Sequence, residues 1–71
     1  MLRKKQRLLA LQQAITGLPT ELREVIMLVA LEELPYEEAA PIIGIPIGTI
    51  KSRIHRARIL IRESIAAALE R

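Results

Sequence analysis

The sequence predicts an all-α fold, a single small four-helix domain over residues 1–71 that contains a helix-turn-helix with a long C-terminal recognition helix. Apolar residues recur at steps of three and four along the chain, which is typical of helices packed on one face. Glycine and proline residues separate these segments. A chain this short folds alone only if its helices bury most of their apolar surface on one another.

The first helix is predicted over about residues 3–15, because Leu8, Leu11 and Ile15 have helical spacing. We expect it to end at Thr16-Gly17, where glycine can take the left-handed conformation common at helix ends. Its cations lie at the N-terminal end, which the helix dipole disfavours. We therefore expect a frayed first turn, or a linker remnant from a preceding domain over residues 1–17, with residues 18–71 making up the rest of the predicted domain.

The second helix is predicted from Leu18-Pro19-Thr20 to about residue 33, since proline is tolerated in a first turn. Residues 25–31 form an unbroken apolar run, and a helix that is apolar all round should be buried on both sides. Two interpretations remain open. Either the first and last helices sandwich it, or a partner protein covers the side that carries Met27, Leu28 and Leu31.

The helix-turn-helix is predicted over residues 36–58, opened by Leu34-Pro35. Its first helix reaches Ile43, and we expect Pro41 to bend or shorten it, because proline removes a backbone hydrogen bond and its ring clashes with the Glu37 carbonyl, at a cost of about 3 kcal/mol or more. Gly44 supplies a permissive turn. Pro46 then precedes the last helix, predicted over residues 47–69.

The last helix is predicted to have one apolar and one cationic face. Advancing about 100° per residue places an apolar stripe inward, formed by Ile50, Ile54, Ala57, Ile61 and Ile65. The opposite side then holds Gly48, Thr49, Ser52, His55 and Arg56. The flanks hold Lys51, Arg53 and Arg58.

Charge is sorted along the chain, whose net charge is +3. Residues 1–19 carry four cations and no acid, residues 20–45 carry six glutamates against Arg23, and residues 46–71 carry six cations against two glutamates. A basic segment on the last helix beside an acidic middle favours a directed footprint for a polyanion such as nucleic acid.

Catalytic and metal chemistry find no support in the sequence. There is no cysteine, and the single histidine, His55, has no second ligand near it, so we expect neither a metal nor another cofactor. The serines lack an acid–base partner system, and no glycine-rich phosphate loop occurs, so we do not expect an enzyme. No apolar run approaches the roughly 18 residues that span a bilayer, and we reject a signal peptide at the start.

Four segments occur in a restrictive order: LP at 18–19, REV at 23–25, LPYEEAA at 34–40 and IGIPIGTIKSRIHRAR at 43–58. Over roughly residues 18–62 this order closely resembles region 4, the C-terminal promoter-binding domain of bacterial sigma factors, particularly the extracytoplasmic-function group. The resemblance implies a cytoplasmic bacterial domain, monomeric in isolation, that recognises the minus-35 promoter element in double-stranded DNA.

The resemblance also implies which helices contact DNA and which contact protein partners. The second motif helix would enter the major groove, and the preceding helices would hold the β flap of the RNA polymerase core, surfaces that anti-sigma factors can also cover. Position by position, the residues at or near DNA would be Thr49, Lys51, Ser52, Arg53, His55 and Arg56, with Arg58 at the backbone. We expect Arg53 and Arg56 to include the main base reader, because arginine can pair with guanine O6 and N7.

Two prolines depart from the family pattern. Pro35 replaces a Ser or Thr cap, and Pro41 replaces a good helix former. The sigma domain that opens the minus-10 region is also missing, so we expect either an excised domain or a free-standing relative that does not initiate transcription alone. The alternatives are a protein-interaction module, a dimeric regulator of the LuxR kind reading a half-site and, more remotely, membrane-surface binding by the first helix.

Overall fold

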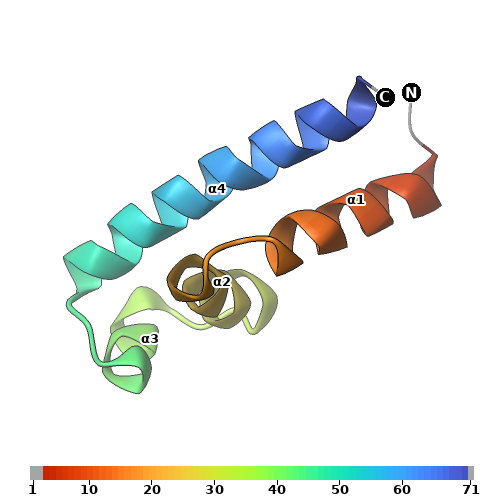
Figure 1. Ribbon diagram of the computed structural model, residues 1–71. Coiled ribbons are helices and arrows are strands. Elements are labelled where there is room, and N and C mark those ends of the chain that lie inside the picture. The colour runs from red at the N-terminus through yellow and green to blue at the C-terminus, as the bar shows by residue number, and fades with distance from the viewer. Residues whose placement is uncertain (1–2, 71) are drawn as a thin grey trace.

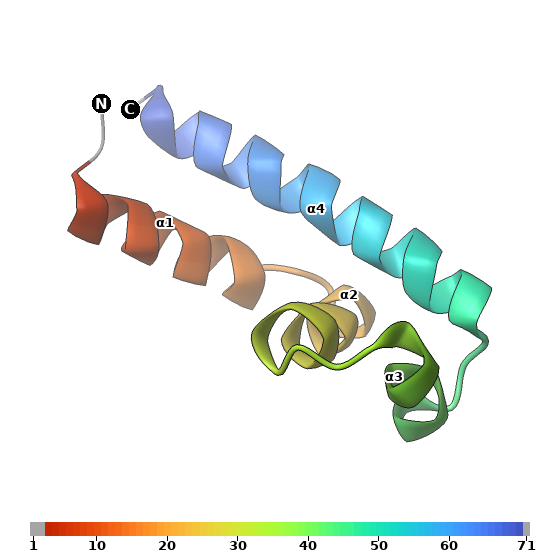
Figure 2. The same ribbon diagram turned by 180° about the vertical axis from the view of Figure 1, so that it is seen from behind.

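The computed structural model describes residues 3–70 and is all-α over that range, as predicted. It contains α1 (Lys4–Thr16), α2 (Thr20–Ile26), α3 (Tyr36–Ile43) and α4 (Ile47–Leu69), with a π-helical turn, η1 (Met27–Leu31), continuing α2. α1 lies beside the C-terminal half of α4 and runs in the opposite direction. α2, η1 and α3 gather toward the N-terminal end of α4 (Figures 1 and 2). The molecule is elongated, 39 × 18 × 15 Å.

The core is aliphatic and joins α2, α3 and the first half of α4. One buried cluster contains Leu18, Leu22, Val25, Ile26, Ala39, Ala40, Ile50, Ile54 and Ala57. Ala39 and Ala57 are fully buried, so the small residues lie where the helices approach closely. Each buried aliphatic side chain of Val or Ile size contributes about 1.5–3 kcal/mol. This cluster sets the orientation of α4.

Proline begins three of the helices. Pro19, Pro35 and Pro46 each occupy the N-cap position with extended ψ values of 145–153°, and none supplies a side-chain cap. Their carbonyls accept the first helical bonds, as in Ile50 N to Pro46 O at 3.1 Å. At Pro35 the first turn is also favoured by Glu37 and Glu38, whose carboxylates suit the positive end of the helix dipole. The predicted helix starts are therefore confirmed.

The two helix-ending glycines differ in conformation. Gly44 is left-handed, with φ of 84°, and its N–H donates to Ala40 O at 2.8 Å, so the predicted turn is confirmed. The left-handed prediction for Gly17 is wrong, because its φ is −80°. The glycine at position 17 instead avoids a close contact, since a Cβ there would lie only 3.2 Å from the backbone oxygen of Gln13.

The second and third helices also depart from the prediction in detail. The second was expected to reach residue 33, but regular α geometry ends at Ile26 and the π-helical turn ends at Leu31, with Glu33 at φ 57°. α3 runs through Pro41 to Ile43, so proline does not end the helix where it stands. Pro41 is exposed, which lets its ring point into solvent. Within residues 3–70, no helix combines the length and apolarity needed to cross a membrane.

Candidate nucleic-acid interface

The first half of α4 turns one face to the core and the other to solvent. Ile50, Ile54 and Ala57 are at most 2% exposed, so the predicted apolar stripe is confirmed in this half of the helix. Ile61 and Ile65, further along, are only half-buried. The polar side chains exposed to solvent in this half are Lys51, Ser52, His55, Arg56 and Arg58, and the apolar Ile47 in the first turn is 39% exposed.

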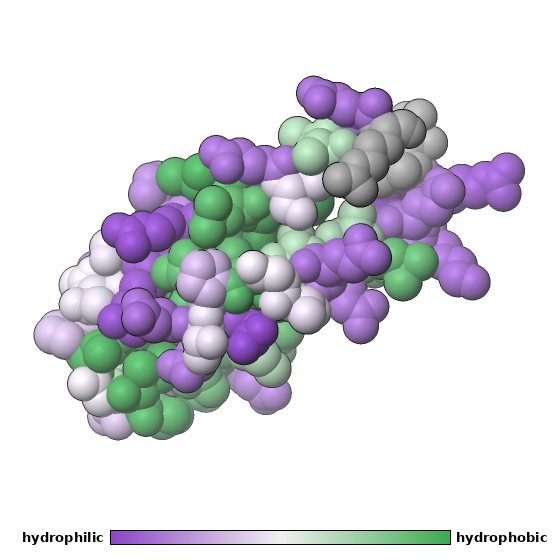
Figure 3. All heavy atoms as spheres, in the orientation of Figure 1, coloured by the Kyte–Doolittle hydropathy of each residue, from purple (hydrophilic) through white to green (hydrophobic). Residues whose placement is uncertain are grey.

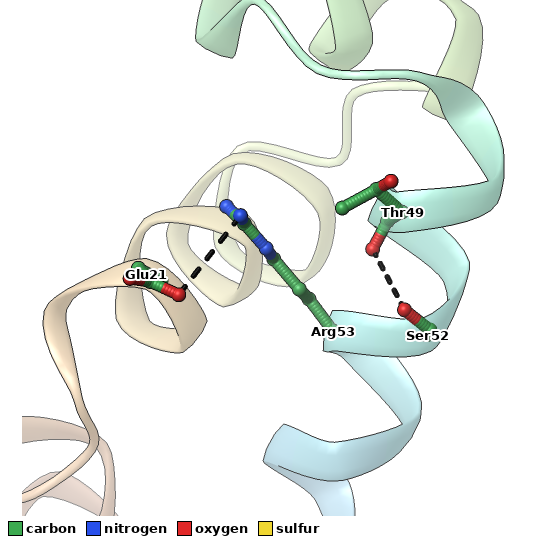
Figure 4. A network of polar contacts seen from close by, with 4 residues as sticks. All are labelled: Glu21, Thr49, Ser52 and Arg53. Carbon is green, nitrogen blue, oxygen red and sulfur yellow. Dashed lines mark hydrogen bonds and ion pairs between the residues drawn. The ribbon is translucent and has the colours of Figure 1, made fainter.

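Thr49 and Ser52 lie at the start of this surface and contact each other. The Ser52 hydroxyl donates to the Thr49 backbone oxygen at 3.3 Å (Figure 4). Thr49 is half-buried and Ser52 is exposed. Hydroxyl groups of this kind suit phosphate contacts, which position a protein on DNA without reading its sequence.

Arg53 differs from the other cations of α4. Its side chain is 24% exposed, and its Nη2 atom lies 3.9 Å from Oε2 of Glu21 on α2 (Figure 4). Glu21 itself is 75% exposed. Ion pairs this open to water contribute only about 0–1 kcal/mol to stability. The contact therefore matters mainly for where the Arg53 guanidinium points, which is toward α2.

The predicted DNA-contacting residues thus share one short stretch of α4. From residue 49 to residue 58 the helix advances about 14 Å. Lys51, Arg56 and Arg58 are exposed there, and no carboxylate lies within 4.0 Å of their charged groups in the described part of the chain. Three unpaired cations on one helix can attract and hold a polyanion.

Only part of the predicted partner surface of Met27, Leu28 and Leu31 is exposed. Met27 is 48% and Leu31 57% exposed, whereas Leu28 is half-buried against the core. α2 therefore packs on α4, but the first and last helices do not sandwich it completely. An apolar hollow of about 330 Å³ lies between α1 and the α2–η1 segment, lined by Leu8, Leu11, Gln12, Ile15, Thr16, Arg23, Met27 and Leu31.

Some exposed apolar residues were not predicted. Ile42 of α3 is 63% exposed and Leu8 of α1 is 59% exposed. Hydrophobic side chains are visible at the α3 end of the molecule and in a band along its middle (Figure 3). A helical wheel would have found Ile42, because it lies about 200° from the buried Ala40. No group of three potential metal-ligating side chains occurs in residues 3–70.

The comparison with known families decides the identity of this helix-turn-helix. The model of the family Sigma-70, region 4, matches residues 8–61, which is most of the chain. The chain belongs to the sigma-70 region 4 family. The match includes α2, η1, α3 and the first half of α4, so residues 49–58 with the exposed Lys51, Arg56 and Arg58 lie inside it.

Sigma factors of the extracytoplasmic-function group are similar to this region 4 chain. The factor SigE of Mycolicibacterium smegmatis is 43% identical over 56 residues, which cover 79% of this chain and 22% of that protein. SigW of Bacillus subtilis is 44% identical over 55 residues, covering 78% and 29%. The sigma-E factor of Escherichia coli K12 is 42% identical over 59 residues, covering 83% and 31%. The chain therefore spans less than a third of each of these relatives.

Proposed function

We propose that this chain binds double-stranded promoter DNA at a minus-35 element, with the first half of α4 in the major groove. The observation that carries the proposal is the exposed cationic surface of α4, opposite Ile50, Ile54 and Ala57, inside a region 4 family match. An α-helix is of a size to enter the major groove, where base pairs present distinct hydrogen-bonding patterns. The proposed activity is binding, without catalysis.

Within this surface we assign different roles to different side chains. Arg56 is exposed and has the reach to pair with guanine, so it is our main candidate for reading a base. Lys51, Ser52 and Arg58 are candidates for phosphate contacts, with Thr49 and His55 beside them. Arg53 belongs to the proposed set by position, but its contact with Glu21 directs it toward α2.

We further propose that the domain acts within a sigma factor and docks on RNA polymerase core through its β flap. The sigma factors that resemble it carry RNA polymerase in their names. Exposed Met27 and Leu31, beside the half-buried Leu28, offer apolar surface for such a partner. An anti-sigma factor would compete for the same surface.

NMR titration of the ¹⁵N-labelled domain tests the DNA-binding proposal. The two probes are a short duplex with a minus-35 sequence of the family type and a scrambled duplex of equal composition, each at low and moderate salt. We expect shifts concentrated on residues 49–58 and larger for the family-type duplex. Equal shifts that moderate salt abolishes for both duplexes would reject sequence-specific recognition.

The exposed Met27 and Leu31 also support a second function, a protein-interaction module with little DNA binding. The titration separates the two functions, since the module predicts salt-sensitive binding without preference. A regulator of the LuxR kind would be a dimer. Sedimentation equilibrium of the free domain distinguishes that case, because our proposal predicts a monomer.

A further inference from the structure

Arg53 is the cation in the proposed DNA-binding set that the fold partly covers. Lys51, His55, Arg56 and Arg58 are exposed, whereas only 24% of the Arg53 side chain is accessible. Figure 4 shows it extending from α4 across to Glu21, away from Thr49 and Ser52. The guanidinium is thus directed toward another helix.

The core keeps the two partners opposite each other. Leu22, next to Glu21, is 3% exposed, and Ile54, next to Arg53, is 2% exposed, and both belong to the same buried cluster. The backbones of Glu21 and Arg53 cannot separate without opening that cluster. The contact is therefore a property of how α2 packs on α4.

The one cation of α2, Arg23, makes a different contact. The Arg23 guanidinium donates to the backbone oxygen of Thr16 at 3.1 Å, which directs it toward the end of α1. In the described part of the chain, Arg53 is the cation within 4.0 Å of the Glu21 carboxylate. Glu21 thus has one partner, and that partner lies on the flank of the proposed DNA-binding surface.

We propose that Glu21 is a positioning residue that restrains Arg53 from contacting DNA phosphates and so keeps the sequence-independent part of binding small. This inference rests on the proposed DNA-binding function. Each phosphate that a protein cation neutralises steepens the salt dependence of binding, with a slope of about 0.9 per contact in log–log form. While Glu21 holds Arg53, that arginine adds nothing to this count, and the contribution of Arg56 to base reading is left unchanged.

The test measures salt dependence on the scrambled duplex, which reports sequence-independent binding alone. Fluorescence anisotropy at salt concentrations from about 50 to 200 mM gives slopes for wild type, Glu21→Gln, Arg53→Gln and the double variant. Glu24→Gln is the matched control, because it removes the same charge from an exposed position of α2 that has no ion pair within 4.0 Å. Circular dichroism confirms that each variant is folded.

We expect Glu21→Gln to tighten binding and to steepen the slope by up to about 0.9, the value for one full phosphate contact, which is roughly an extra eightfold change in affinity per tenfold change in salt. Adding Glu21→Gln to Arg53→Gln should leave the slope of Arg53→Gln unchanged. Glu24→Gln alone should have the slope of the wild type. If Arg53→Gln does not fold, Arg53→Met replaces it, because methionine keeps an apolar stem.

Three results would overturn the inference. A slope change of equal size with and without Arg53 would make Glu21 a simple repulsive charge. An unchanged slope in Glu21→Gln would mean that Arg53 is not restrained. Weaker binding by Glu21→Gln would mean that the pair presents Arg53 to DNA.

Failure of the proposed function gives a different result. If wild type binds the family-type and scrambled duplexes equally, promoter recognition fails, yet the comparison of slopes on the scrambled duplex still tests Glu21. Absence of binding to both duplexes at the lowest salt would overturn both proposals.

Discussion

Arg56→Ala is the substitution that most directly tests the proposed reading surface. Arg56 lies about 60° from the centre of the outward face of α4 and is exposed, so its truncation should leave stability within about 0.5 kcal/mol of wild type. A paired contact to guanine is worth about 1–3 kcal/mol of discrimination. Since about 1.4 kcal/mol corresponds to a tenfold change, affinity for the family-type duplex should fall roughly 5- to 140-fold.

The assay is fluorescence anisotropy with the family-type and scrambled duplexes at one fixed salt concentration. Arg62→Ala is the matched control, because Arg62 is also exposed and equally close to the centre of the outward face, but lies about 9 Å further along α4. We expect it to change affinity little on either duplex. An equal loss on both duplexes for Arg56→Ala would refute base reading and leave a phosphate contact. A loss of the same size for Arg62→Ala would refute the placement of the surface.

Three further predictions concern the scaffold. Pro41→Ala should raise stability by about 2 kcal/mol, because the missing backbone hydrogen bond and the ring clash of an interior proline together cost about 3 kcal/mol and less than about 1 kcal/mol is lost through a freer unfolded chain; an unchanged or lower melting temperature by circular dichroism would contradict this. Gly44→Ala should cost about 1–2 kcal/mol in urea unfolding, because φ of 84° strains any residue with a Cβ, and an unaffected midpoint would be evidence against the left-handed turn. Ile54→Ala should cost about 2–5 kcal/mol while exposed Met27→Gln stays within about 0.5 kcal/mol, and similar losses for both would contradict the burial described.

Local rules were enough to predict the helices and the direction of α4. Pro19, Pro35 and Pro46 begin helices because a first turn does not need their missing N–H groups, and this depends on no distant residue. The burial of Ile50, Ile54 and Ala57 follows from the helical period alone. Gly44 is left-handed because a glycine between two helices meets no steric penalty there.

Features that depend on tertiary packing were not predictable in the same way. The right-handed conformation of Gly17 could not be deduced from the residue type, because glycine adopts either hand without a steric penalty. Nothing in the apolar run over residues 25–31 distinguishes an α from a π turn. Helical spacing did set apart the side that carries Met27 and Leu31, which is exposed, but it did not show that Leu28 on that side packs against the core.

The candidate site likewise contains some features that helical spacing predicts and one that depends on tertiary packing. Helical spacing alone gives the shared outward surface of Ser52, His55 and Arg56, and each of them is exposed. Their DNA contacts stay predictions until tested. The contact between Arg53 and Glu21 joins residues far apart in the chain, so a wheel drawn on α4 could place Arg53 on a flank but could not supply its partner.

α4 carries the core and the proposed DNA surface on opposite sides of one helix, and this explains why most substitutions should affect either stability or binding. Inward residues such as Ile54 make no outward contact, and outward residues such as Arg56 have no part in the core. Arg53 lies between the two sides, because its side chain is only 24% exposed and its guanidinium is paired with Glu21 of α2. At such a border position, the packing of α2 on α4 can alter how many cations the proposed DNA-binding surface presents. Substitutions on the outward surface should therefore leave the core intact, whereas a change at Glu21 or Arg53 should link the packing of α2 on α4 to the proposed DNA binding.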